Sequence, residues 1–181
     1  MRKQMEKLIQ VNHRFANKLW ATPKGLVFSD GYILIEWAGE KGTETFPSNY
    51  ESLFNQHEAR GPAVPFGRAT IQEVEEVQRQ SIEERRKRVD AAKQHVSAAR
   101  LAAEERKSRK ALAEAEDLLI KAREHVTPFR CQGAYLNPQF LLKILKILKT
   151  GTIQAGDGPL APVLILGKDV RALIMPRQQE V

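Results

Sequence analysis

The spacing of hydrophobic positions changes sharply at two places in the chain, near Gly67 and near Pro128. Between these points there is no Gly or Pro, and most residues are Glu, Arg, Lys, Gln or Ala. Such a composition favours a helix, because these residues lose little side-chain freedom in it and nothing interrupts the backbone hydrogen bonds. The pattern therefore predicts a long helical arm over residues 71–126.

Two apolar stripes follow this arm with the spacing of a coiled-coil seam. The first stripe consists of Ile82, Val89, Val96 and Ala103, with Ala92 and Ala99 between them. The second stripe consists of Leu112, Ala115, Leu119, Ala122 and Val126. The polar run 104–110 separates the stripes and shifts their phase, which predicts an antiparallel coiled-coil hairpin that folds near Ser108. The alternative is one uninterrupted helix, about 85 Å long at 1.5 Å per residue.

The segments on either side of the arm resemble each other, since each predicts a helix followed by three strands. In the first segment the helix covers 3–18, and the strands cover 19–22, 26–29 and 32–37. In the second segment the helix covers 137–149, and the strands cover 152–155, 160–166 and 170–175.

Local signals support these elements. The pair Asp30-Gly31 is typical of a β-hairpin turn, and Asn137 followed by Pro138 is typical of a helix start. Residues 128–134 could add a strand before the second helix and so complete a β-α-β-β-β unit, for which the first segment has no room. The sequence thus predicts an α+β fold made of a first unit, an irregular lead-in, the helical arm and a second unit, which cover residues 1–49, 50–70, 71–126 and 127–181 respectively.

Both predicted helices carry basic residues opposite their apolar face. At 100° per residue, the basic positions are Lys3, Lys7, Arg14 and Lys18 in the first helix and Lys143, Lys146 and Lys149 in the second. On a single helix such residues indicate an ordinary solvated face. Their recurrence in two similar units favours a shared surface that faces phosphates, which would bind without sequence specificity and with a steep salt dependence.

The distribution of charge sharpens this interpretation. The chain has 29 Lys and Arg against 22 Asp and Glu, a formal net charge of +7. Residues 71–126 hold 13 basic and 12 acidic residues, whereas residues 127–181 hold 7 and 3. The arm is therefore nearly neutral, and most of the excess lies in the second unit.

The sequence contains no recognisable catalytic or metal-binding pattern. The four histidines lack the paired spacing of a zinc site, and neither a phosphate-binding loop nor a nucleophile motif is present. We expect no enzyme activity, no metal and no cofactor. The single cysteine, Cys131, cannot form an internal disulfide, and there is neither a secretory signal nor a membrane-spanning stretch. These features favour a reducing cytoplasm and no membrane partner.

The last third of the chain resembles the final domain of the β sliding clamp of bacterial DNA polymerase III. The resemblance rests on an Asn near the start of a helix with a Leu-rich core, and on two later motifs. One motif is the strand Leu160, Pro162, Val163, Leu164 and Ile165, and the other is the ending Ile174, Met175, Pro176 and Arg177. The first helix and its Asp-Gly hairpin fit the same domain more loosely, so about half of the chain is covered.

The resemblance implies a clamp domain with the sheet outside and two basic helices lining a hole for duplex DNA. It also implies that Ile174, Met175 and Pro176, with Arg177 at the rim, contribute to a cleft for short peptides of polymerases and repair proteins. Clamps of this family have six domains around the ring, so a comparable ring would need six copies of this chain. The long arm is a departure from the family.

We therefore expect a non-enzymatic, sliding-clamp-like protein that binds the duplex DNA backbone and acts in DNA replication as a processivity or recruitment factor. Its expected partners are double-stranded DNA, further copies of the chain as a homo-oligomer, and a polymerase or other replication protein. The alternative is a protein-protein interaction adaptor that uses the arm and the clamp-like scaffold and has little affinity for DNA.

Overall fold

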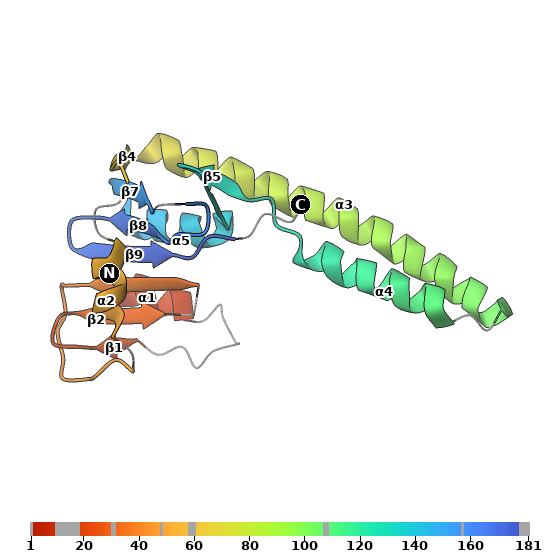
Figure 1. The fold of residues 1–181 in the computed structure, drawn as a ribbon, viewed down its shortest axis with the longest axis horizontal. Coiled ribbons are helices and arrows are strands. Elements are labelled where there is room, and N and C mark those ends of the chain that lie inside the picture. The colour runs from red at the N-terminus through yellow and green to blue at the C-terminus, as the bar shows by residue number, and fades with distance from the viewer. Residues whose placement is uncertain are drawn as a thin grey trace. The chain divides into compact units, whose positions relative to one another are not determined.

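The computed structural model describes residues 2–9, 19–29, 32–47, 49–57, 61–106, 109–156 and 158–177. The fold is mixed α+β, as expected from the sequence, with a seven-stranded and a two-stranded antiparallel sheet (Figure 1). The chain divides into two compact units, Met1–Glu75 together with Pro128–Val181, and Glu76–Thr127. Here the first is called the sheet unit and the second the arm.

The large sheet consists of two three-stranded meanders that join through their last strands. Its order is β1 (Trp20–Ala21), β2 (Leu26–Ser29), β3 (Ile33–Trp37), β9 (Val170–Ile174), β8 (Val163–Leu166), β7 (Gly151–Ala155) and β4 (Val64–Phe66). Strands β3 and β9 pair antiparallel, with Ile35 opposite Ala172 at the centre. In strand order the meander β1-β2-β3 corresponds to β7-β8-β9, so the two halves of the sheet repeat one topology.

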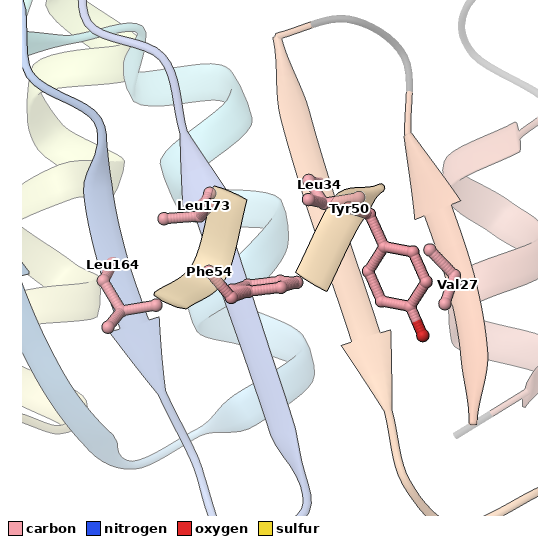
Figure 2. Packing of buried hydrophobic residues seen from close by; sticks show 6 residues of the cluster. All are labelled: Val27, Leu34, Tyr50, Phe54, Leu164 and Leu173. Carbon is pink, nitrogen blue, oxygen red and sulfur yellow. The ribbon is translucent and has the colours of Figure 1, made fainter. Parts of the chain in front are cut away.

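Helices cover both faces of this sheet. Helices α1 (Arg2–Ile9) and α5 (Pro138–Leu148) contact each other, and α5 packs on β9. Figure 2 shows α2 (Tyr50–His57) in front of the sheet and α5 behind it. Side chains alternate along a strand, so Leu34 and Leu173 point toward α2. Their neighbours Ile35 and Ala172 then point to the opposite face of the sheet, which α5 covers.

The lead-in over residues 50–70 is not irregular, and this expectation was wrong. It contains α2, β4 and the start of α3 (Arg68–Arg106). Helix α2 has only eight residues, and three prolines lie nearby in the sequence. A helix this short shows too few turns for its hydrophobic period to be recognised. Its position is fixed by Tyr50 and Phe54, which are buried against a cluster completed by Val27, Leu34, Leu164 and Leu173 (Figure 2).

Several local signals produced the expected elements. Asn137 caps α5 by accepting a hydrogen bond from the backbone N–H of Gln139 at 3.0 Å, and Pro138 occupies the first turn. The expected strand near residue 130 is β5 (Phe129–Cys131), which pairs with β6 (Ala134–Leu136) in the two-stranded sheet. The first helix is described as α1, and residues 10–18 of the expected helix lie outside the described residues. The expected strand over 160–166 begins only at Val163, because Leu160 lies in a turn and is exposed.

The arm is an antiparallel helical hairpin, not one uninterrupted helix. Helix α3 ends at Arg106 and α4 (Arg109–Glu124) follows. Arg100 Nη2 lies 3.9 Å from Glu116 Oε1, and the backbone N–H of Thr127 donates to Ser81 Oγ at 2.9 Å. These contacts pair the two helices in opposite directions and set their register.

The buried seam of the arm follows small residues. Its most buried positions are Ser81, Ala92 and Val96 in α3 and Ala115 and Ala122 in α4. Ile82, expected in the seam, is 49% exposed, so this assignment was wrong. Ser81, one residue earlier, takes the inward position because its hydroxyl accepts the Thr127 hydrogen bond at the base of the hairpin.

Candidate nucleic-acid interface

Helix α5 presents the basic residues that were expected to face phosphates. It buries Leu141, Leu142, Ile144, Leu145 and Ile147 on the sheet side. Among its basic residues, Lys146 and Lys149 are exposed and Lys143 is half-buried. The helix therefore has the predicted division into an anchoring face and a cationic face.

Lys146 is held by a residue of another helix, and Lys143 lies over an aromatic ring of α5 itself. Lys146 Nζ lies 2.7 Å from Glu75 Oε1 of α3, within the sheet unit. Lys143 Nζ lies 5.7 Å from the ring centre of Phe140, which in turn stacks on Tyr32 with 5.9 Å between centroids. The outer face of α5 is therefore not free of acidic groups, since α3 brings Glu75 to it.

Lys149 closes the end of α5 in an unusual backbone conformation. Its φ is 66°, and its N–H donates to the carbonyl of Leu145 at 2.7 Å. Glycine or asparagine is the usual residue at a helix end with positive φ, because a β-carbon is strained there. A lysine at this position places a charge at the sheet end at some cost in backbone energy.

Fewer of the predicted basic residues of the first helix lie within the described residues. Lys3 is exposed; the side chain of Lys7 and all of Arg14 and Lys18 lie outside the described residues. Arg2, which the sequence did not single out, forms ion pairs with Glu6 at 3.0 Å and with Glu40. These two carboxylates raise the pKa of Arg2, first through the hydrogen bond to Glu6.

The four residues of the C-terminal motif lie in different surroundings. Ile174 is fully buried at the end of β9, whereas Met175 is 46% exposed. Pro176 is half-buried, and Arg177, also half-buried, donates its backbone N–H to the Tyr135 carbonyl at 2.8 Å. Of the four, Met175 lines an apolar pocket.

This pocket has a volume of about 120 Å³ and lies between α2 and the end of β9. Its lining includes Met175, Tyr32, Leu53, Phe46 and Pro162. Sequence reasoning missed Leu53 and Phe46, because the segment around α2 was expected to be irregular. Tyr32 could have been found, since an exposed aromatic residue beside a hairpin turn is a common contact residue.

A largely buried ion pair holds the centre of the sheet unit. Glu36 and Arg171 lie opposite each other on β3 and β9, with Nε–Oε1 and Nη2–Oε2 distances of 3.1 and 3.2 Å. The Arg171 guanidinium lies 4.3 Å from the ring centre of Phe54 on α2. Burial raises the pKa of Tyr50, whose hydroxyl lies 3.3 Å from Thr22 Oγ1. This network fixes α2 on the sheet and so shapes one wall of the apolar pocket.

Reactive and metal-binding groups are scarce in the part of the chain that the structure describes. Burial raises the pKa of the Cys131 thiol, so little thiolate forms at neutral pH. Within the described ranges, no group of three or more His, Cys, Asp or Glu side chains is arranged to hold a metal ion. None of the described helices has the length and apolar character needed to cross a membrane.

Comparisons of the chain with protein-family models, curated proteins and solved structures found no match.

Proposed function

We propose that this chain is a non-enzymatic, clamp-like protein that contacts the duplex DNA backbone without reading bases and acts in DNA replication as a processivity or recruitment factor. The observation that carries the proposal is the paired placement of α1 and α5. Each helix precedes one meander of the large sheet, and the meanders join through β3 and β9. The two helices contact each other, and Lys3, Lys146 and Lys149 on them are exposed.

Basic side chains on two adjacent helices suit phosphate contacts because they neutralise charge without reading base edges. Each phosphate neutralised lowers the slope of log affinity against log salt by about 0.9. A rise from about 50 to 200 mM salt then weakens binding roughly 3.5-fold for each contact. A surface with several such contacts gives an easily measured salt effect.

The test measures binding of a short labelled duplex by fluorescence anisotropy at these two salt concentrations. The variant changes Lys143, Lys146, Lys149, Lys7 and Arg14 to Glu. We expect the wild type to bind at low salt and the variant to lose most of the affinity and most of the salt slope. A control with charge reversals on the arm, at Arg86, Lys87 and Lys93, should retain both.

A second variant uses the Glu75–Lys146 ion pair. Glu75→Gln removes the carboxylate that holds Lys146, so duplex affinity should rise if α5 faces DNA. An absence of binding at low salt, or binding indifferent to all of these changes, would remove the DNA proposal.

The apolar pocket favours a second candidate function, that of a protein-protein interaction adaptor. Tyr32, Leu53 and Met175 are all exposed and line one pocket, which suits an apolar side chain of a partner segment. The arm also exposes Leu101, Leu118 and Ile120. A chain that binds no duplex in low salt but copurifies with a partner, and loses it on Met175→Glu, would fit this candidate better than the first.

A further inference from the structure

Three chain segments meet at the end of the large sheet where β7 begins. Phe66 of β4 pairs with Gly151, and Leu166 of β8 pairs with Thr152. A β-carbon on Gly151 would lie 2.0 Å from the Leu166 carbonyl oxygen, so only glycine allows this approach. The ends of β4 and β8 and the start of β7 are therefore in direct contact.

Each of these segments carries an exposed basic residue two positions from its paired residue. Arg68 follows Phe66, Lys149 precedes Gly151 and Lys168 follows Leu166. Two residues span at most about 7 Å of chain, so the three backbones lie close together. A β-carbon on Gly167 would lie 2.5 Å from Leu148 Cδ2, which places the turn that holds Lys168 against the end of α5.

These three cations differ from the basic residues farther along the two helices. The structure pairs Lys146 with Glu75, and Arg2 with Glu6 and Glu40. The ion pairs and side-chain hydrogen bonds between described residues do not include Arg68, Lys149 or Lys168. One exposed carboxylate, Asp169, follows Lys168, so the group keeps a net charge of about +2.

We propose that Arg68, Lys149 and Lys168 form a phosphate-contact cluster, the sheet-end cluster, that binds the backbone of duplex DNA. The inference rests on the proposed function and moves the main contact from the middle of α5 to its C-terminal end. Cations without a protein partner bind phosphate without first losing an ion pair. The backbone strain at Lys149 places one of these charges where glycine would fit better.

The experiment compares the wild type with R68E/K168E, which leaves all residues of the α1 and α5 basic faces unchanged. The probe is the same labelled duplex, titrated over the range from about 50 to 200 mM salt. Loss of two phosphate contacts lowers the magnitude of the salt slope by about 1.8. The fourfold salt increase should then weaken the variant about 12-fold less than the wild type. The matched control is R86E/K87E on the arm, which changes the net charge equally.

The possible outcomes separate the cluster from the function as a whole. Wild-type binding with an unchanged slope in R68E/K168E overturns the cluster and leaves DNA binding in place. An equal loss in R86E/K87E also overturns it, because the effect is then one of net charge. A wild type that binds no duplex overturns both proposals. Circular dichroism of each variant shows whether the fold is retained, and R68Q/K168Q repeats the test with neutral side chains if the charge reversals unfold the sheet unit.

Discussion

Among substitutions that remove one charge, we expect the change of Arg171 to lower the stability of the sheet unit most. Arg171→Met leaves the Glu36 carboxylate without its cation near Tyr50 of α2, where the Glu36 side chain is only 9% exposed. Breaking a buried ion pair from one side costs about 3–5 kcal/mol. The Arg171 side chain is 22% exposed, so water reaches the site and we expect the lower end, about 3 kcal/mol.

A double-mutant cycle separates the ion pair from the surrounding packing. Glu36→Leu alone leaves a charged guanidinium beside Phe54, and we expect a loss of about 2 kcal/mol because Arg171 remains partly solvated. In the double variant E36L/R171M both charges are absent and two apolar side chains face α2. Since apolar replacement of a buried pair is often neutral, the double variant should be less than about 1.5 kcal/mol below the wild type.

Urea unfolding followed by tryptophan fluorescence is the assay. The protein has two tryptophans, Trp20 in β1 and Trp37 in β3, so this signal reports on the sheet unit and not on the arm. Arg130→Met, at an exposed position of β5, is the control and should change stability by less than about 0.5 kcal/mol. A loss below about 1 kcal/mol in Arg171→Met, or a double variant as unstable as the sum of the single variants, would refute the reasoning.

Three further predictions follow from single features of the structure. Lys149→Gly should raise the unfolding free energy by up to about 1 kcal/mol, because glycine relieves the strain of the positive φ of 66°. The same change should weaken duplex binding in the anisotropy assay. Lower stability or unchanged affinity would contradict this prediction. Phe54→Ala should cost about 3–5 kcal/mol in urea unfolding, because this ring of α2 is fully buried against the sheet, whereas Leu53→Ala, at a position 43% exposed, should cost far less. Equal losses would show that α2 does not hold the sheet. Hydrogen bonds to Arg79 and Gln80 lower the Glu76 pKa to about 2, and the bond from Thr127 lowers that of Glu84. Their stabilising effect is therefore present above the ordinary value near 4.5 and lost as pH falls toward 2, so the melting temperature of the arm should drop in this window and drop less in E76Q/E84Q.

Elements with strong local signals were predictable from the sequence. The Asn137-Pro138 start of α5, the hairpin between β2 and β3, and the phase shift that ends α3 each arise from residues close together in the chain. For α5 the deciding interaction spans two residues, since the Gln139 N–H donates to Asn137 Oδ1. Local sequence is enough to read contacts of this kind.

Features that depend on distant contacts were not predictable. Helix α2 is too short to show a clear period, so its burial against β8 and β9 could not be foreseen. Glu36 occupies a position that strand alternation assigns to the face opposite α5, and it becomes buried because α2 covers that face. Glu75 and Lys146 form an ion pair between two helices although they are 71 positions apart in the sequence. A helical projection of α5 alone therefore cannot show this pair. Helix α5 lies where the sequence predicted a helix, but the ion pair that neutralises Lys146 is visible only in the tertiary structure.

The edges of the large sheet bear on whether copies of this chain can close a ring. The β1 edge is occupied, because Gly42 and Glu44 donate backbone N–H groups to the carbonyls of Thr22 and Ala21 at 2.9 and 2.8 Å. The β4 edge has three residues, and its central residue, Pro65, has no N–H to donate. Neither edge offers a regular row of donors and acceptors to a strand of another copy.

Closure of a six-copy ring by continuation of the sheet is therefore disfavoured. We expect mass measurement in solution to give fewer than six copies, and any self-association to use side chains of the arm or of the apolar pocket. Without a closed ring, the protein binds DNA through one open surface. It should therefore dissociate from linear and from covalently closed circular duplexes at the same rate. A stable hexamer that leaves linear duplexes faster than circular ones would show that the ring closes by other contacts, and that DNA passes through it.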